Sequence, residues 1–359
     1  MKFERLRIEH LRCLDEVELH PGPGLNFFVG ANGAGKTSVL EAACLLSYAR
    51  SFRSGSKDAL LQRGEKQLSI YGEIYHGQQT HRLGLGRESG RWSARVDGAT
   101  VERLSGLIRH CAVVCFEPGS HALIAGAAEE RRRFLDWGVF HVEHAFLGTW
   151  QRYRRALKQR NALLRGASMP SDNLLTPWER EMDQCAQHIE GERQRYLQTL
   201  EGELKALCRL ILPELGAFFL DYRPGWNVSQ SLAQALQQNR EKDRSRGHTT
   251  VGIHRADWRP RFEQAPHREH FSRGQEKLCA MACVLAQARV FARQNGEWPV
   301  VCLDDLASEL DVLHQEAVVG LLKDVDAQVL ITGTEVPNVI LEQETRMFHV
   351  EHGRISTMA

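Results

Sequence analysis

Residues 30–37 have the types and spacing of a loop that binds nucleotide phosphates. The run Gly-Ala-Asn-Gly-Ala-Gly-Lys-Thr follows an apolar segment, residues 25–29, and precedes a helical pattern over residues 38–48. Its glycines let backbone N–H groups point inward at the start of a helix, where anions are stabilised. Lys36 adds a charge for the β- and γ-phosphates, and the Thr37 hydroxyl can bind Mg²⁺. The sequence therefore predicts an ATP-type site, the alternative being a glycine-rich turn without a ligand. The residues expected to contact the nucleotide are Gly30, Ala31, Asn32, Gly33, Ala34, Gly35, Lys36, Thr37 and Ser38.

Two adjacent carboxylates, Asp304 and Asp305, end a second apolar segment, residues 299–303. Beside a phosphate loop, a strand end of this kind holds the metal ion, so we expect Asp304 to bind Mg²⁺ together with Thr37. Asp305 could orient or deprotonate the attacking water. We predict Lys36, Asp304 and Asp305 as catalytic residues. The alternative is a pair of acids that only keeps a strand end soluble.

The segment Ser272-Arg273-Gly274-Gln275 opens a further helical pattern. A serine hydroxyl and the N–H groups that follow it at a helix start suit a γ-phosphate. Many helices begin with Ser and Gly, so the assignment depends on the position of this segment before the Asp304 strand. We predict Ser272, Gly274 and Gln275 as further nucleotide contacts. The segment Ser308-Glu309-Leu310-Asp311 follows the two acids directly.

Strand patterns in the first third of the chain must position the phosphate loop. Alternation of apolar and polar residues suggests an antiparallel meander with one buried face. Residues 17–19 and 25–29 flank a Pro-Gly turn, and residues 112–116 suit a buried parallel strand. The other segments with strand patterns are residues 68–74, 81–85 and 92–96.

Helical spacing dominates from residue 129 to about residue 212. Thr176 as N-cap, Pro177 at the first helical position and Glu179 closing a capping box predict a helix start, and Pro213 predicts its end. Residues 237–247 are polar and are expected to form a mobile loop. The last part of the chain predicts a helix over residues 275–293 and strands over residues 300–303 and 328–332. We therefore expect an α/β domain, residues 1–125 and 249–359, interrupted by a helical insertion, residues 126–248.

The composition favours a globular protein of two domains. The net charge is +1 and the chain has nine cysteines without a CxxC pair, so we expect local charge patches and reduced core thiols. The N-terminus lacks the apolar core of a signal peptide. The longest apolar run, residues 278–291, contains Gln287 and Arg289 and is too polar to span a membrane. We expect a cytoplasmic protein with no membrane partner.

The order of these motifs resembles the ABC-type ATPase heads of the SMC/Rad50/RecF group, and the RecF family within it. Arg50-Ser51-Phe52-Arg53, residues 131–136 (Arg-Arg-Arg-Phe-Leu-Asp) and Gly252-Ile253-His254-Arg255 also resemble landmarks of that family. The resemblance covers nearly the whole chain, whose length leaves no room for a long coiled coil. It implies an α/β, ABC-type P-loop ATPase head with an antiparallel β lobe, interrupted by a helical lid domain.

Some positions depart from the pattern of the family. Gly119 and Ala128 stand where an acid and a proline are usual, and Ile253 replaces a proline. Thr332 and Thr334 stand where transporter ATPases keep a switch histidine. The phosphate loop, the Ser272 segment and the paired acids are intact.

The resemblance also implies a mechanism and partners. Two heads would sandwich ATP, with the Lys36 loop of one subunit facing Ser272 of the other. This ATP-driven homodimer would clamp DNA until slow, DNA-stimulated hydrolysis releases it. Arg12 resembles an arginine that reaches the phosphates in related heads, although a simple surface arginine is the alternative. The implied partners are RecR and RecO, with RecA downstream, in single-strand gap repair, DNA replication and SOS induction.

Two groups of basic residues are candidates for binding the DNA backbone. One lies in a stretch without acids between His144 and Ser171, where a solvated helix face is the alternative. Such contacts would be independent of sequence and sensitive to salt. Whether single strands, double strands or junctions are preferred stays open. The candidates are Arg152, Arg154, Arg155, Lys158 and Arg160 in that stretch, and Arg50, Arg53, Lys57 and Arg63 elsewhere.

Two other functions compete with an ATP-switched repair factor. An ABC ATPase subunit of a membrane transporter would share the phosphate loop, but the helical insertion and the missing switch histidine disfavour it. A structural DNA clamp that binds ATP without hydrolysing it is the other alternative.

Overall fold

The computed structural model describes residues 1–53, 57–143, 145–166 and 171–358, and the chain divides into two compact units. The first unit combines Met1–Ser120 with Lys277–Ala359, and the second is His121–Glu276. The second unit begins slightly before the insertion suggested by the sequence, residues 126–248, and ends well after it. Among the described residues, no helix is long and apolar enough to cross a membrane.

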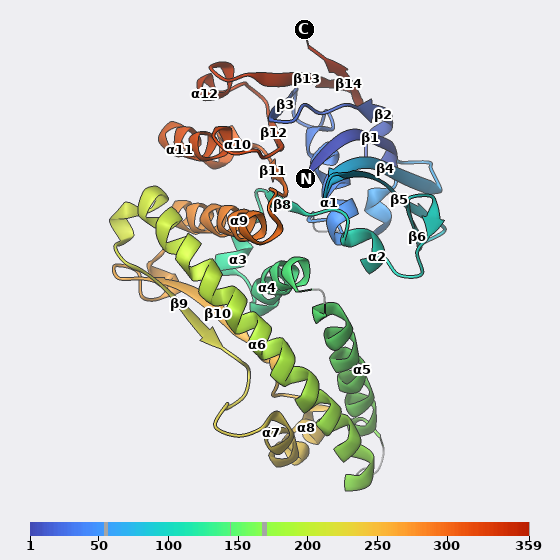
Figure 1. The fold of residues 1–359 in the computed structure, drawn as a ribbon, viewed down its shortest axis with the longest axis vertical. Coiled ribbons are helices and arrows are strands. Elements are labelled where there is room, and N and C mark those ends of the chain that lie inside the picture. Colours follow the sequence, from blue (N-terminus) through green and yellow to red (C-terminus); the bar gives the residue numbers. More distant parts are fainter. Residues whose placement is uncertain (54–56, 144, 167–170, 359) are drawn as a thin grey trace. The chain divides into compact units, whose positions relative to one another are not determined.

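The first unit contains a mostly parallel sheet in the order β14-β13-β3-β12-β11-β8 (Figure 1). Its central strands are almost uniformly buried and apolar, as expected of parallel strands covered on both faces. Because β3, β12 and β11 run parallel as neighbours, their carboxyl ends meet at one edge of the sheet. The phosphate loop follows β3 at that edge and the paired acids follow β11. The strands are β3 (Leu25–Val29), β8 (Val113–Phe116), β11 (Val300–Leu303), β12 (Val329–Gly333), β13 (Thr345–Glu351) and β14 (Arg354–Thr357).

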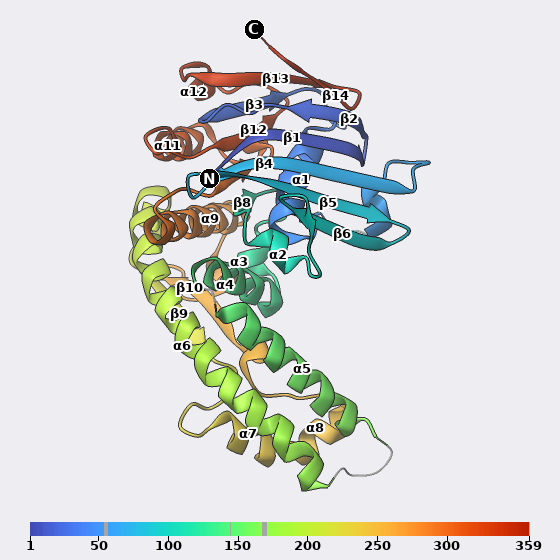
Figure 2. The ribbon, with the colours of Figure 1, turned by 45° about the vertical axis from the view of Figure 1, so that its right-hand side comes forward.

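The same unit contains an antiparallel sheet in the order β2-β1-β4-β5-β6-β7 (Figure 2). The predicted meander is confirmed for β4, β5 and β6. The expected turn does not join two strands of one sheet, because β2 pairs with β1 while β3 lies in the parallel sheet. Strand β1 was not predicted, although its buried positions alternate over much of its length. The strands are β1 (Lys2–Leu11), β2 (Leu14–Leu19), β4 (Gln67–His76), β5 (Gln79–Glu88), β6 (Arg91–Val96) and β7 (Ala99–Thr100).

Helix α1 (Lys36–Tyr48) packs against both sheets of the first unit and buries most of its residues. The long helix α9 (Arg273–Asn295) and the strands β11 and β12 lie where the sequence predicted them. The remaining helices of the first unit are α2 (Ser105–Ile108), α10 (Leu306–Glu309), α11 (Val312–Lys323), α12 (Asn338–Leu341) and the short 3-10 turn η1 (Lys57–Leu60).

The second unit is built around α6 (Asp172–Ile211), a helix of 40 residues with a buried apolar stripe. Helix α5 (Phe146–Leu164) runs beside it in both views (Figures 1 and 2). A two-stranded sheet of β9 (Phe218–Arg223) and β10 (Asp257–Phe262) packs on α6 and α4 (Ala128–Val142). The smaller helices of this unit are α3 (Ala122–Ala125), α7 (Leu232–Gln238), α8 (Arg240–Arg246), η2 (Pro213–Leu215), η3 (Ile253–Arg255) and η4 (Arg268–His270).

Two predictions in this unit are wrong. Helix α6 begins at Asp172, so Thr176 and Pro177 lie inside it rather than at its start, while Pro213 does follow its end. Burial of the apolar stripe outweighs the one backbone hydrogen bond that a proline near the helix start removes. Residues 237–247 are largely helical, because α7 begins with a capping box at Ser231 and α8 buries two charged residues that have partners, Arg240 and Asp243.

Candidate nucleotide-binding site

The phosphate loop joins β3 to α1 and has room only for glycine at two fixed positions. A side chain at Gly30 would collide with the carbonyl oxygen of Val350. Gly35 has a φ of +118° and directly precedes α1, and a Cβ there would lie 2.8 Å from Cδ2 of Leu14. Glycine therefore turns the chain into the helix, whose first N–H groups face the end of the loop.

Lys36 folds back over the loop. Its Nζ donates hydrogen bonds to the carbonyl oxygens of Gly30 at 2.8 Å and Ala31 at 2.9 Å. The pKa of Lys36 is lowered, because burial disfavours its charged form. The nearby carboxylates of Asp305 and Asp304 oppose this shift without cancelling it. The ammonium is thus held at the loop by weak carbonyl acceptors, which a phosphate can replace.

Thr37 and Asp304 meet across the edge of the parallel sheet. The Thr37 hydroxyl donates to Oδ1 of Asp304 at 2.9 Å, and the Thr332 hydroxyl donates to the same oxygen at 2.7 Å. Burial raises the pKa of Asp304, and the hydrogen bonds from Thr332 and Thr37 oppose that shift. The structure thus brings together the two residues that we predicted as metal ligands.

Thr332 is a site residue to which the sequence assigned no role. It lies near the end of β12, the strand between those that carry the phosphate loop and the acids, and its hydroxyl oxygen also accepts the backbone N–H of Asp305 at 2.8 Å. One hydroxyl therefore orients both Asp304 and the backbone of Asp305. The available signal was a polar residue near the end of an apolar strand that neighbours the loop strand.

Asp305 lies at the start of α10 with a φ of +53°, a conformation that non-glycine residues rarely adopt. Its Oδ1 is buried and has no hydrogen-bond partner within the described part of the chain. A buried carboxylate oxygen without a partner next to Asp304 fits a bound metal ion or its water. The hydroxyl and carboxylate oxygens present here are the ligands that Mg²⁺ prefers.

Arg12 is engaged by a buried carboxylate. Its Nε and Nη2 donate to Glu41 at 3.0 and 2.7 Å, and Nη1 donates to the carbonyl of Ala59 at 2.6 Å. The neighbouring Cys13 thiol contacts the Gly33 carbonyl at 3.9 Å, which places this turn against the phosphate loop. Glu41 lies one helical turn after Thr37, so Arg12 is held beside the loop with its guanidinium on α1.

The Glu41 carboxylate also binds two residues of the Arg50–Arg53 segment. The Ser51 hydroxyl donates to Glu41, and Nη1 of Arg53 lies 3.8 Å from it. Burial raises the pKa of Asp304, and the positive charge of Arg53 is one of the smaller effects that oppose this rise. Arg53 therefore belongs to the electrostatic surroundings of the nucleotide site, although we predicted it only as a DNA contact. Arg50 and Arg63 are exposed, and the side chain of Lys57 lies outside the described residues.

The Ser272 segment starts α9 and belongs to the second unit. The Ser272 hydroxyl accepts the N–H of Gln275 at 3.2 Å, and Oε1 of Gln275 accepts the N–H of Ser272 at 3.0 Å. Gln275 also donates to Glu214 at 3.1 Å. This reciprocal capping leaves Ser272 and Gly274 exposed, so the start of the helix is open to a ligand.

The basic stretch on α5 separates into buried and exposed residues. Arg160 is fully buried and bonds to Asp243 at 2.7 Å and Glu179 at 3.1 Å, so its proposed contact with DNA is wrong. Arg152 is exposed but pairs with Glu181 at 2.8 Å. A cavity of about 640 Å³ lies along the rest of this face. Its basic and aromatic lining is Trp150, Arg154, Arg155, Lys158 and Arg165.

Residues 131–136 and 252–255 are linked through other side chains of the second unit. Arg131 forms a bidentate ion pair with Asp257 at 2.6 and 3.1 Å. Arg193 bridges Asp136 at 2.7 Å and the carbonyl of Ile253 at 2.9 Å. Residues 131–136 and 252–255 therefore join α4 to α6 and the β10 strand, which gives them a structural role.

The chain is similar over its whole length to proteins of one family. The family described as RecF/RecN/SMC N terminal domain matches residues 2–356. The DNA replication and repair protein RecF of Xanthomonas axonopodis pv. citri (strain 306) is 48% identical over 367 residues, which cover 100% of this chain and 99% of that protein. The protein of the same name from Shewanella baltica (strain OS155 / ATCC BAA-1091) is 34% identical and matches along 100% of both chains.

Solved structures agree with this fold. The recombination mediator protein RecF with ATP, described in the RecFOR pathway, superposes with a TM-score of 0.90 at 24% identity and covers 99% of this chain and 97% of its own. An Smc head bound to the C-winged helix domain of ScpA superposes with a TM-score of 0.61 at 15% identity, covering 100% of this chain and 98% of its own. The α/β ATPase head with an antiparallel lobe is thus the fold of this chain, as the sequence predicted.

Proposed function

Because this chain belongs to the RecF/RecN/SMC family, we propose that it is an ATP-switched DNA-binding protein of DNA replication and repair. The observation that carries the proposal is the contact of Thr37 with Asp304 at the mouth of the Lys36 loop, with Thr332 fixing the carboxylate. The names of the full-length relatives support the role in repair.

In this proposal the phosphate loop binds ATP, and Lys36 exchanges its two carbonyl acceptors for phosphate oxygens. Thr37 and Asp304 would hold Mg²⁺, which neutralises charge on the phosphates. Asp305, with its unpartnered carboxylate oxygen, would orient or deprotonate the attacking water. Arg12 and Arg53, gathered on Glu41, would add positive charge beside the triphosphate.

We further propose that ATP drives a homodimer. The start of α9 carries an exposed serine and exposed backbone N–H groups that can bind a γ-phosphate of a second subunit. Ligand binding favours whichever state binds the ligand better, so ATP shared between two subunits would stabilise their closed dimer. Slow, DNA-stimulated hydrolysis would then open it.

DNA would contact the exposed part of α5. Arg154, Arg155, Lys158 and Arg165 line one groove, and the guanidinium of Arg154 lies 4.7 Å from the Trp150 ring centre. A groove with several cations and no acidic side chain among its lining residues suits the sugar-phosphate backbone rather than base edges. The similar RecF–ATP structure is that of a recombination mediator protein in the RecFOR pathway. We extend this to RecR and RecO as partners of this chain, with RecA downstream, in gap repair and SOS induction.

ATP hydrolysis by wild type and Lys36→Ala, each with and without DNA, tests the enzyme proposal. We expect DNA to stimulate the wild type and Lys36→Ala to lose activity by on the order of 100-fold, since the lysine stabilises charge at the phosphates. Lys205→Ala, which breaks only a half-exposed ion pair with Glu201, is the control and should hydrolyse ATP like the wild type. Equal background rates in all samples, with ATP still bound, would favour a non-hydrolysing clamp.

A further inference from the structure

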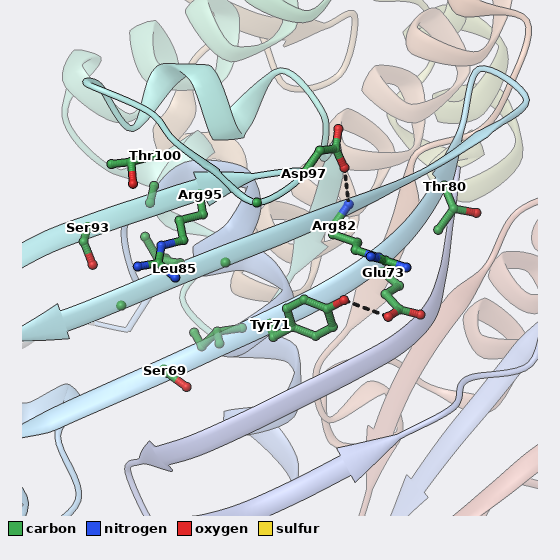
Figure 3. Close-up of a pocket in the computed structure, with 15 residues that line it drawn as sticks. Ser69, Tyr71, Glu73, Thr80, Arg82, Leu85, Ser93, Arg95, Asp97 and Thr100 are labelled. Atoms are coloured by element: carbon green, nitrogen blue, oxygen red, sulfur yellow. Dashed lines mark hydrogen bonds between the residues drawn. The ribbon is translucent and has the colours of Figure 1, made fainter.

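A cavity of about 830 Å³ lies on the outer face of the antiparallel sheet, and none of its lining residues belongs to the phosphate loop. Figure 3 shows Ser69, Tyr71 and Glu73 along β4, and Ser93 and Arg95 along β6. Strand β5 runs between these two strands. The cavity is therefore a trough whose floor is β5.

Two outward-facing glycines make that floor. Gly84 and Gly86 alternate with Leu83 and Leu85, whose side chains are buried in the core. The strand register places Gly84 between Tyr71 and Arg95. It likewise places Gly86 between two serines, Ser69 on β4 and Ser93 on β6. The outward side chains of β4 and β6 thus lie on either side of β5, which has no side chain on this face at Gly84 and Gly86.

The fold does not require glycine at Gly84. Neither Gly84 nor Gly86 has a positive φ, and the atom nearest to a Cβ at Gly84 would be Cβ of Arg95 at an ordinary 3.7 Å. At Gly86 a Cβ would lie 3.0 Å from the Ser93 hydroxyl oxygen, a tight contact with a side chain rather than with the backbone. Gly72 is different, because a Cβ there would lie 2.9 Å from Leu46 and 3.2 Å from Phe3 in the core. Glycine weakens a strand and often marks a place where a ligand approaches the backbone. Packing in the core explains Gly72, whereas the packing around Gly84 does not call for glycine and a ligand would explain it.

The walls of the trough supply an aromatic ring and an unpaired cation. Tyr71 is half-buried, and its hydroxyl donates to Glu73 at 2.7 Å. Asp97 accepts the N–H of Arg82 at 2.8 Å and bonds to His81 at 2.9 Å. These carboxylates are engaged, while the exposed guanidinium of Arg95 has no hydrogen-bond or ion-pair partner within the described ranges. The guanidinium of Arg95 is therefore free to bind an anion.

We propose that this trough binds one nucleotide unit, with a planar base on the Gly84–Gly86 floor beside Tyr71 and a phosphate on Arg95. Adjacent strands lie roughly 4.8 Å apart, so the slot between β4 and β6 is about 10 Å wide, which fits a nucleobase. Hydroxyls of Ser69, Ser93 and Thr100 line the same space and can bond to base or sugar. The unit can belong to single-stranded DNA or be a free nucleotide, and only the choice of DNA rests on the proposed function.

Binding of a fluorescent oligo(dT) at saturating ATP tests the trough, because ATP then occupies the phosphate loop. Gly84→Val puts a β-branched side chain on the floor of a strand that favours one, so the variant should fold at least as stably as the wild type. We expect Gly84→Val and Arg95→Glu each to weaken oligo(dT) binding by about tenfold or more, because the first variant blocks the floor under the base and the second removes the phosphate contact. Arg95→Lys should keep much of the affinity.

The salt dependence separates the two parts of the site. Arg95→Glu removes one phosphate contact and adds a negative charge, so it should reduce the slope of log affinity against log salt by about 0.7 or more, while Gly84→Val should leave the slope unchanged. Gly320→Ala, in an open position on α11, is the matched control and should behave as wild type. Unchanged melting temperatures would show that the variants are folded.

Three other results would decide between a nucleotide site, a protein docking surface and no site at the trough. Wild-type affinity for oligo(dT) in Gly84→Val would overturn the proposal. So would loss of RecO or RecR binding with oligo(dT) binding intact, since the trough would then be a protein docking surface. If wild type binds no DNA, the proposed function fails; binding of dTMP that is lost in both trough variants would still support a nucleotide site.

Discussion

At the scale of single residues, the site depends on a threonine hydroxyl that the sequence left without a role. The motifs predicted that Thr37 and Asp304 would meet, because both follow strands that end beside a phosphate loop. They did not predict that Thr332 would orient Asp304 and the backbone of Asp305 at once. A hydrogen bond between neighbouring strands depends on strand order, and β12 is separated by about three hundred residues from the strand that carries the loop.

Thr332→Val removes this hydroxyl and keeps the side-chain shape. We expect ATP binding to persist and hydrolysis to fall about tenfold or more, because Asp304 and Asp305 lose their orientation. The hydrogen bond from Thr332 lowers the pKa of Asp304, so its loss should raise that pKa. Since the metal needs the carboxylate form, the acid limb of the pH–rate profile should move to higher pH.

Steady-state hydrolysis from pH 5 to pH 9 measures this effect, and Thr332→Ser is its control because it restores the hydroxyl. An equal loss of rate at every pH would argue against the role of the hydrogen bond. A loss confined to thermal stability would make Thr332 purely structural.

At the scale of secondary structure, helix α5 shows that basic residues close together in the sequence can have different environments. The basic residues of α5 look equivalent in the sequence, yet the helical period turns Arg160 inward and Arg155 outward. Arg160 joins α5 to α6 and α8 through Glu179 and Asp243, and these acids lie 19 and 83 residues away along the chain. The same network explains why residues 237–247 are not a loop. The spacing of apolar residues within a segment predicted the long helices and the apolar strands. It could not predict ion pairs buried between segments that are far apart in the sequence.

Arg160→Met and Arg155→Met should therefore have opposite effects. Arg160→Met leaves Asp243 without its buried arginine, so we expect the second unit to lose about 3–5 kcal/mol of unfolding free energy. Arg155→Met should change stability by less than about 0.5 kcal/mol but weaken duplex DNA binding and lower its salt slope by about 0.9. Urea unfolding and DNA titrations at several salt concentrations measure both quantities. Equal stability of the two variants would contradict the buried network, and unchanged DNA binding in Arg155→Met would remove α5 from the interface.

At the scale of the whole molecule, the first unit is discontinuous in the sequence, because the second unit, His121–Glu276, is inserted between its two parts. The phosphate loop and the paired acids predicted this arrangement, because their chemistry requires one site. The exact limits did not follow from the sequence, since the β9–β10 hairpin joins residues on both sides of α7 and α8. The division into units places the Ser272 segment in the second unit and the Lys36 loop in the first. In the proposed homodimer, the Ser272 segment of one subunit would face the Lys36 loop of the other.

Ser272→Asp tests this composite site without removing the helix cap. Aspartate caps a helix as well as serine does, so α9 should stay intact, but its negative charge would face the γ-phosphate. We expect a subunit of the variant to bind ATP as tightly as the wild type, and its ATP-dependent dimer to be weakened by at least about tenfold, or ~1.4 kcal/mol. Ser272→Thr keeps the hydroxyl and should still dimerise. Sedimentation with a slowly hydrolysed ATP analogue, with and without DNA, measures the dimer. A wild type that stays monomeric under these conditions would show that the Ser272 segment does not complete the site, as would a Ser272→Asp variant that dimerises normally.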